Sequence, residues 1–410
     1  MKNQKKLPLA AQIFIALILG ITSGMLLQGH AAEAESYIKP FGTIFLNLLK
    51  FIVVPIVLFS IMDGMFSLKD AGKIGSIGLM TIVYYLFTTA LAVTIGMGGG
   101  MIFRRFFPVL QTTDLVYEAA APVSIMDTVV NIFPSNFIAP MSSAAMLQVI
   151  FMALLIGMSI NILGKDGEPA ARAISSFYRV FIKCMELILK LSPVGVFCLI
   201  CPVVAANGAA VLGSLAMVLL AAYICYAVHI IVVYSFSVKI LGGISPAEFF
   251  KAELPAMIFA FSSASSVGTL PVNLQSCRKM GAPKEIASFV LPLGATINMD
   301  GTAIYQGVCA IFIASCFGIE LTLGEMAVIV LTATLASIGT AGVPGAGMVM
   351  LAMVLTSVGL PVEGIALVAG VDRIFDMGRT VVNITGDASC VMVVSNLLRK
   401  KESKAASDNT

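Results

Sequence analysis

Charged residues are scarce in this chain. Only 11% of its 410 residues are Asp, Glu, Lys or Arg, whereas 59% are hydrophobic. Because soluble domains contain about a quarter charged residues, a water-soluble enzyme and a disordered chain are both excluded. The net charge of +3 is too small for a surface that binds nucleic acid. A membrane protein remains, with membrane lipid and no nucleic acid among its partners.

The alternating pattern of membrane β-strands, about 10 residues each, is also missing. The sequence contains longer apolar runs instead, at 7–28, 39–64, 73–103, 121–163, 177–205, 209–240, 285–317 and 362–397. Since a helix needs about 20 apolar residues to cross a bilayer, these runs predict an all-α polytopic protein with eight transmembrane helices. The first run is longer than the roughly 7–15 apolar residues of a signal peptide, which favours an uncleaved helix.

Two further apolar stretches are interrupted by small and polar residues. FSSASSVGTLP lies within 255–279, and ASIGTAGVPGAG lies within 325–358. The apolar flanks, about 10 to 15 residues each, are too short to cross a bilayer of ~30 Å. Each stretch is therefore predicted to be a re-entrant helical hairpin, whose tip must be buried or line a cavity. Because each hairpin precedes a helix with charged residues, the pattern indicates an internal repeat with a binding site at its interface.

Lysine and arginine are absent from the connections at 206–208, 318–324 and 359–362. They gather instead at both ends of the chain and in the alternate loops. Because positive residues accumulate on the cytoplasmic side, a multi-pass protein of the inner membrane with both termini in the cytoplasm is expected. Arg104 and Arg105 are exceptions to this pattern.

The last apolar run carries polar residues on one face. At 100° per residue, their spacing confines them to an arc of roughly 100°. These residues are Asp372, Asp376, Arg379, Thr380, Asn383 and Asp387. Ionisable groups within a membrane are costly and mark substrate or ion pathways; a purely structural polar network is the alternative. Arg373 lies off this face and is expected to snorkel or to pair near the helix end.

The charges of this polar face are not balanced. Asp300, in the preceding run, adds a fourth carboxyl group to the three on the face, against the one guanidinium of Arg379. Such an excess in a low-dielectric site requires bound cations or protonated carboxyl groups, and the surrounding oxygen donors suit hard cations. The sequence therefore predicts a symporter coupled to Na⁺ or H⁺.

The same face predicts the substrate. Arg379 presents a planar fork that matches a carboxylate, and Asp376 would pair with an ammonium group. Ser265 and Ser266 at the first hairpin tip, with backbone N–H groups at both tips, offer donors to a second carboxylate. One ammonium and two carboxylates describe an acidic amino acid.

With these residues the sequence resembles the dicarboxylate/amino acid:cation symporter family, which includes glutamate and aspartate transporters. The resemblance covers essentially the whole chain. It is carried by the serine-rich tip at 262–271, NMDGT at 298–302, the tip GVPGAG at 342–347, and the segment 376–387. It implies an inverted-repeat, glutamate-transporter-like fold of eight transmembrane helices and two re-entrant hairpins.

The resemblance also implies a homotrimer that works as an elevator, in which a transport domain moves against a fixed scaffold. The scaffold would comprise 1–65 (helices 1 and 2) and 121–205 (helices 4 and 5). The transport domain would comprise 73–103 (helix 3) and 209–398 (helix 6, hairpin 255–279, helix 7, hairpin 325–358 and helix 8), followed by a cytoplasmic tail at 399–410.

For the substrate, the resemblance implies that Arg379 holds the side-chain carboxylate and Asp376 the amino group. The other substrate-binding residues would be Ser265, Ser266, Thr302, Val343, Gly347, Thr380 and Asn383.

The resemblance further implies three sites for co-transported Na⁺. The first would use Asp387 and Asn383 with backbone near Asn298 and Met299. The second would use Tyr85, Thr88, Thr89, Asn298 and Asp300. The third would use backbone carbonyls at Thr296, Ser337, Ile338 and Thr340. Without the resemblance, ordinary hydrogen bonding between helices would explain the residues at 85–89 equally well.

The sequence departs from relatives in places. Ala264 and Val267 occupy tip positions that are often polar, and Gln306 replaces a titratable carboxyl of animal glutamate carriers, which puts proton co-transport by that route in doubt. Asp376 together with Arg379 favours aspartate or glutamate. A C4-dicarboxylate symporter coupled to Na⁺ or H⁺ is the alternative within the family, and an ion channel is the alternative outside it.

Two further features carry no predicted chemistry. His229 lies in an apolar helix without an acidic neighbour in sequence, so it is interpreted as a packing residue. An enzyme is not expected, because no Ser, Cys or His nucleophile lies near a base.

Overall fold

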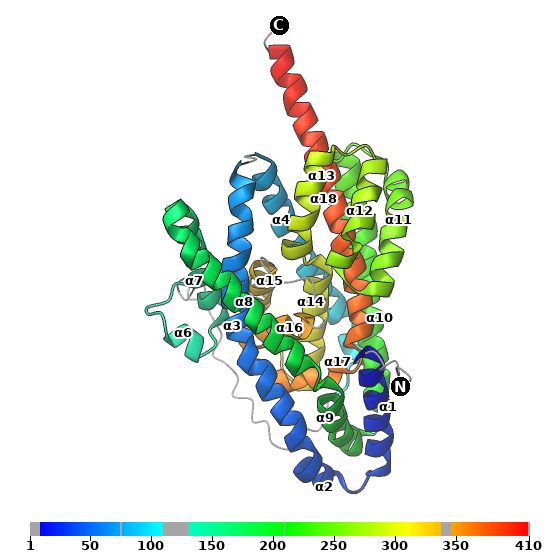
Figure 1. Cartoon of the computed structure of the whole chain (residues 1–410). Coiled ribbons are helices and arrows are strands. Elements are labelled where there is room, and N and C mark those ends of the chain that lie inside the picture. The colour runs from blue at the N-terminus through cyan, green and yellow to red at the C-terminus, as the bar shows by residue number, and fades with distance from the viewer. Residues whose placement is uncertain are drawn as a thin grey trace, which may run out of the picture.

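The computed structural model describes residues 9–73, 76–109, 130, 132–208, 210–337 and 346–408, and every regular element in these ranges is a helix (Figure 1). The all-α prediction is confirmed for this part of the chain. Among the described residues, five segments are long and apolar enough to cross a membrane: Ile77–Phe106, Gln148–Ile188, Gly213–Leu241, Lys284–Cys316 and Asp372–Lys401. The chain is therefore a polytopic membrane protein, while the count of eight spans stays a prediction.

A first group of helices comes mostly from the N-terminal half. It comprises α1 (Leu9–Leu26), α2 (Ala31–Glu33), α3 (Lys39–Lys73), α6 (Ala139–Ser142), α7 (Met146–Leu163), α8 (Glu168–Leu189) and α9 (Ser192–Asn207). α1 packs along α9, and α3 packs against α7, α8 and α9. α1, α7 and α9 are apolar around most of their circumference, as helices in lipid are.

A second group consists of the last helix and the helices packed around it. It comprises α4 (Ser76–Phe103), α10 (Ala210–Val228), α11 (Pro246–Ser263), α12 (Ser266–Lys279), α13 (Lys284–Ile297), α14 (Asp300–Cys316), α15 (Leu323–Ala336), α16 (Ala346–Ser357), α17 (Ile365–Ala369) and α18 (Asp372–Asp408). α4 packs along α14 despite their separation in sequence. Gly96 allows this close approach, because a Cβ there would overlap the backbone of Ile304.

Short irregular helical turns join several of these elements. They are η1 (Ala34–Ile38), η2 (Arg104–Phe106), η3 (Gly164–Gly167), η4 (His229–Tyr234), η5 (Ser237–Leu241) and η6 (Val362–Gly364). η4 and η5 are π-helical. Such bulges often occur at functional sites, and η4 places two side chains of the candidate site.

The first predicted hairpin forms as two packed helices, α11 and α12. Ala264 ends α11 in the left-handed conformation (φ 49°), and the Ser265 hydroxyl accepts from the Gly268 amide at 3.0 Å to cap α12. The second predicted hairpin corresponds to α15 and α16, which also pack together; its tip, 338–345, lies outside the described residues. The position of both hairpins in the membrane stays a prediction.

Helix boundaries differ from the predicted apolar runs in three places. α11 begins at Pro246 rather than 255, because its first turns are amphipathic and escape a search for apolar residues. The run 177–205 is interrupted at 190–191, before Pro193, which has no amide to continue α8. α18 continues through most of the predicted tail to Asp408, since its last residues are largely helix formers. Figure 1 shows this end projecting beyond the other helices.

Candidate functional site

All six polar residues of the predicted face on α18 are buried, none more than 6% exposed. They are Asp372, Asp376, Arg379, Thr380, Asn383 and Asp387. α10, α11, α12, α13 and α14 pack against α18 and cover this face. Burial of so many polar groups inside a membrane protein indicates a binding site or an ion path.

Two carboxylates hold the guanidinium of Arg379. Its Nε donates to Asp376 Oδ1 at 2.8 Å, while Nη1 and Nη2 donate to the two oxygens of Asp372 at 3.1 and 3.3 Å. The ring of Tyr305 lies 4.9 Å from Arg379 Cζ, a cation–π contact. Gly347 packs on the guanidinium, because a Cβ there would overlap it. The second hairpin therefore covers the arginine through α16.

Arg373 joins the first hairpin tip to the same cluster. Its Nη2 donates to the Ser263 carbonyl oxygen at 3.2 Å, and its Nη1 lies 3.7 Å from Asp376 Oδ2. The predicted pairing of Arg373 is thus made with the tip and with Asp376. Two guanidinium groups consequently flank the carboxylate of Asp376.

A break between α13 and α14 fits against the middle of α18. The Asn298 Nδ2 donates to the carbonyl oxygen of Asn383 and to Asp387 Oδ1, both at 2.9 Å, and the Gly301 amide donates to Asn383 Oδ1 at 2.7 Å. Asn298 Oδ1 is buried and has no hydrogen-bond partner among the described residues. The break therefore brings amide and carboxylate oxygens together in the interior.

Asp300 forms a second buried centre where α14 begins. Its carboxyl is 0% exposed. Thr89 donates to Oδ1 at 2.6 Å, Tyr234 donates to Oδ2 at 2.8 Å, and His229 Nε2 lies 3.2 Å from Oδ2. The structure describes no Lys or Arg bonded to this carboxylate, so it is surrounded by neutral hydroxyls and an imidazole.

Tyr85 and Asp387 converge on Gly294 of α13. A Cβ at Gly294 would overlap both the Tyr85 hydroxyl and Asp387 Oδ1. The Tyr85 hydroxyl donates to the Val290 carbonyl oxygen at 3.3 Å. α4, α13 and α18 thus each contribute oxygen atoms to one small region.

The model of the sodium:dicarboxylate symporter family matches residues 9–397 of the chain. The chain belongs to this family. It is 35% identical over 399 residues to the proton/sodium-glutamate symport protein of Bacillus subtilis (strain 168), with 95% of the chain and 92% of that protein covered. It is 36% identical over 422 residues to the proton/glutamate-aspartate symporter of Escherichia coli (strain K12), with 99% and 96% covered. It is 28% identical over 399 residues to a C4-dicarboxylate transport protein of B. subtilis, with 94% and 93% covered.

Membership confirms the family resemblance that the motifs indicated, and it makes the chain a cation-coupled transporter. The residue roles inferred for the symporter's site stay predictions. Several of its predicted site residues bond within their own helix, to a carbonyl three or four residues earlier: Thr88, Thr296, Ser337 and Thr380. These contacts are ordinary for hydroxyls in apolar helices and assign no role.

The remaining predicted residues of the symporter differ in what the structure describes of them. Ser266 is buried at the start of α12. The Thr302 hydroxyl and the Asn383 amide face the sulfur of Met299, at 3.8 and 3.4 Å. Three further predicted residues, Ile338, Thr340 and Val343, lie outside the described residues.

Sequence reasoning missed some polar contacts of the symporter. His229 was interpreted as a packing residue for want of an acidic neighbour, yet it contacts Asp300 across the fold. Tyr234 was not singled out, although the π-helical turn η4 directs both side chains to the same carboxylate. Glu253 is fully buried in the first hairpin and was also missed, because a single acid near charged neighbours resembles an exposed helix face.

Proposed function

We propose that this symporter moves an acidic amino acid, L-aspartate or L-glutamate, together with Na⁺. The observation that carries the proposal is the buried pair of Arg379 and Asp376, joined at 2.8 Å. It sets a carboxylate-binding group beside an ammonium-binding group. A substrate can exchange into this pair, its side-chain carboxylate taking Arg379 and its amino group taking Asp376, so that neither buried charge is left unpaired.

The other substrate contacts come from the two hairpins and the α13–α14 break. Gly347 already packs on Arg379, and Arg373 ties the first tip to the same cluster. We assign the second substrate carboxylate to the hydroxyls and N–H groups of the first tip. Ser265, Ser266, Thr302, Val343, Thr380 and Asn383 complete the assigned set.

Na⁺ is assigned to the buried oxygens that have no cationic partner. Asp387, with the unpartnered Oδ1 of Asn298 nearby, supports one site, and Asp300 with Thr89 supports another. Tyr85, Thr88, Met299, Thr296 and Ser337 are carried over from the family pattern. Na⁺ prefers such hard oxygen donors, and its charge compensates the excess of carboxyl groups.

A C4-dicarboxylate symporter is the second candidate. It is favoured by the two guanidinium groups of Arg373 and Arg379 on either side of Asp376, which offer anion-binding capacity beyond one carboxylate. Against it, the Asp376 carboxylate would repel a substrate that lacks an amino group. The first candidate therefore accounts for more of the site.

The proposed mechanism is an elevator in a homotrimer with eight spans and two re-entrant hairpins. Its support is the packing of the helices. Helices of the first group (α1, α3, α7, α8, α9) pack mainly against one another, and helices of the second group (α4, α10–α18) do the same. The first would be the scaffold and the second the transport domain. Both termini are assigned to the cytoplasmic side of the inner membrane.

The test is uptake of labelled aspartate into proteoliposomes under an inward Na⁺ gradient, with choline replacing Na⁺ as the control. Uptake should require the gradient and should be inhibited by unlabelled glutamate but not by succinate or alanine. Uptake that is indifferent to Na⁺ would refute the coupling, whereas strong inhibition by succinate would move the assignment to the dicarboxylate candidate.

A further inference from the structure

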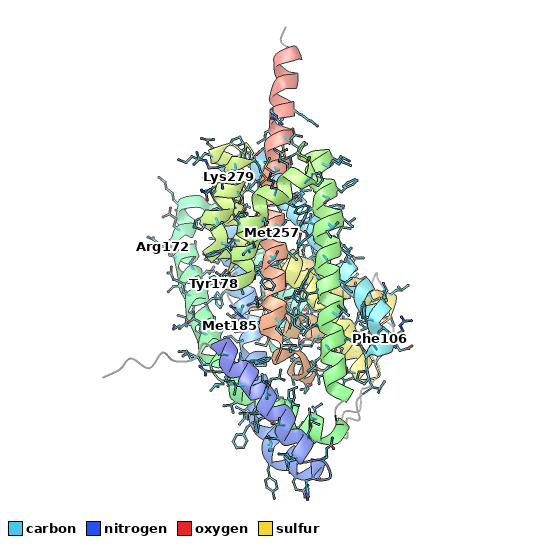
Figure 2. The ribbon with its side chains drawn as sticks, turned by 90° about the vertical axis from the view of Figure 1, so that its right-hand side faces the viewer. Phe106, Arg172, Tyr178, Met185, Met257 and Lys279 are labelled. Atoms are coloured by element: carbon cyan, nitrogen blue, oxygen red, sulfur yellow. The ribbon has the colours of Figure 1, made fainter. Side chains whose placement is uncertain are left out.

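A cavity of about 630 Å³ lies at one end of the second helix group, and none of the residues proposed to bind substrate or Na⁺ lines it. It lies between the turn before α11, the turn that joins α12 to α13, the start of α4 and the later part of α18. Lys279, labelled in Figure 2, precedes the lining residue Met280 and marks this end of the molecule, from which α18 projects. Cavities of roughly 300–1,000 Å³ are typical of sites for small molecules.

The cavity lies at the depth where several helices leave the membrane. Four of its lining residues each lie within two residues of the end of a segment that is long and apolar enough to cross a bilayer: Ile77, Gly242, Glu285 and Arg399. The segments are Ile77–Phe106, Gly213–Leu241, Lys284–Cys316 and Asp372–Lys401. Because an apolar segment ends where hydrocarbon gives way to the polar interface, the cavity lies at the level of the lipid headgroups.

Apolar and charged side chains line the cavity together. The apolar wall includes the buried side chains of Ile286 and Met392. The charged residues are Arg399, Glu248 and Glu285, and all three are exposed. A phospholipid at this depth offers the start of its acyl chains to the apolar wall and its headgroup to the charged residues.

The three charged side chains do not pair with one another. Among the residues that the structure describes, no ion pair or hydrogen bond joins Arg399 to Glu248 or Glu285. The Nη2 of Arg399 donates to Asn396 Oδ1 at 2.9 Å, and the rest of its planar fork stays available. Charges of both signs that line one cavity without pairing suit a ligand that carries an anionic and a cationic group.

The wall beside Arg399 is held in place and contains a further polar group. Asn396 Nδ2 donates to the Leu241 carbonyl oxygen at 2.8 Å, which ties α18 to the end of η5. The Ser395 hydroxyl, on another lining residue, is buried and has no hydrogen-bond partner among the described residues. Such a group calls for an explanation. A phosphate bound by Arg399, one helical turn away, would supply the missing acceptor.

The cationic group of such a ligand is best matched by a primary ammonium. Glu248 and Glu285 present carboxylates, which accept hydrogen bonds from N–H groups. A quaternary ammonium has no N–H group and is recognised by aromatic rings, whereas no aromatic residue lines the cavity in the described part of the chain. The lining therefore favours an ethanolamine headgroup over a choline headgroup.

We propose that the cavity binds a phospholipid of the cytoplasmic leaflet whose headgroup carries a phosphate and a primary ammonium, as in phosphatidylethanolamine. Arg399 and Ser395 hold the phosphate, Glu248 and Glu285 hold the ammonium, and the apolar wall contacts the glycerol and the first carbons of the chains. All helices that line the cavity belong to the second helix group, so this group alone binds the lipid. The inference does not rest on the proposed substrate or on Na⁺ coupling.

The test is thermal unfolding of the detergent-solubilised protein at rising concentrations of dioctanoyl phospholipids. A ligand that binds the folded state raises the unfolding midpoint by mass action. Dioctanoyl phosphatidylethanolamine should do so at a concentration about tenfold lower than phosphatidylcholine or phosphatidylglycerol of the same chain length, because only its headgroup offers both matched groups. Arg399→Gln and the double variant Glu248→Gln/Glu285→Gln should each raise the required concentration about tenfold.

The matched control is Lys279→Gln, which removes an exposed charge at the same end of the molecule without touching the cavity lining; its response should equal that of the unaltered protein. Equal responses to the three lipids, or a response to phosphatidylethanolamine that is unchanged in the charge variants, overturn the proposal. Soluble glycerophosphoethanolamine that acts at the same concentration as the lipid also overturns it, in favour of a soluble zwitterion. If Arg399→Gln does not fold, the double variant, altered only at exposed side chains, decides the result.

Discussion

The two ends of the polar face on α18 differ in how their buried carboxyl groups are balanced. Near the start of the helix, Asp372 and Asp376 share the guanidinium of Arg379. Further along α18, Asp387 accepts a hydrogen bond from the amide of Asn298. Asp300, at the start of α14, accepts a hydrogen bond from the Thr89 hydroxyl and lies beside the imidazole of His229. A balanced cluster is suited to exchanging ion pairs with a charged substrate, whereas an unbalanced one is suited to collecting cations.

The largest expected effect comes from Arg379→Ala. It leaves the buried Asp372 without its partner and Asp376 with only the 3.7 Å contact to Arg373, so we expect the free energy of unfolding to fall by roughly 3–5 kcal/mol and acidic substrate binding to be lost. Some affinity for neutral amino acids should remain. Calorimetric binding with an amino-acid panel and thermal unfolding in detergent measure both. The control is Arg172→Ala, on the exposed side of α8 (Figure 2). Equal loss of acidic and neutral substrates would contradict the assigned role.

Asp300→Asn tests the buried carboxyl groups that are not paired with a guanidinium. The amide keeps a partner for Thr89 and Tyr234 but removes the negative charge, so the protein should fold while its Na⁺ requirement rises. We expect the half-saturating Na⁺ concentration for uptake to increase about tenfold or more, equivalent to ~1.4 kcal/mol. Asp166→Asn, in an exposed turn, is the control. An unchanged Na⁺ titration would remove Asp300 from the cation sites.

Gly347→Ala tests whether α16 must lie on the arginine. A Cβ would overlap the guanidinium, so either the hairpin or Arg379 must shift, with an expected cost of about 1–3 kcal/mol in substrate affinity. Gly98→Ala is the matched control in α4, where nothing lies within 4 Å of the new methyl group. Binding that is as tight in Gly347→Ala as in Gly98→Ala would show that this contact is dispensable.

The smallest effect on folding is expected from Thr380→Val. The Thr380 hydroxyl bonds the Asp376 carbonyl of its own helix at 2.7 Å, so its removal should change the unfolding free energy by less than ~0.5 kcal/mol. If the hydroxyl also binds substrate, aspartate affinity should fall while Na⁺ dependence stays unchanged. A binding isotherm identical to that of the unaltered protein would restrict Thr380 to a structural role.

The sequence predicts the polar face well because a helix turns residues at a fixed angle, so spacing alone places Asp376 and Arg379 together. The polar residues clustered around Gly301, inside an apolar run, also stand at the place where α13 ends and α14 begins. Contacts between distant segments were not foreseeable. The approach of His229 to Asp300 depends on how α10 and η4 pack, and periodicity contains no information about that.

Helix starts were also harder to predict than helix faces. The amphipathic first turns of α11 do not register as an apolar run, and this hid Glu253 as well. Arg373 was placed off the polar face correctly, but its contact with the Ser263 carbonyl oxygen depends on where the first hairpin folds back.

The contact at Gly96 has a consequence for motion. Backbones that touch without intervening side chains cannot slide or rotate past one another without collision. α4 is therefore locked to α14 as a single rigid element, although the chain between them passes through the first helix group. Any displacement of α14 must therefore carry α4 along.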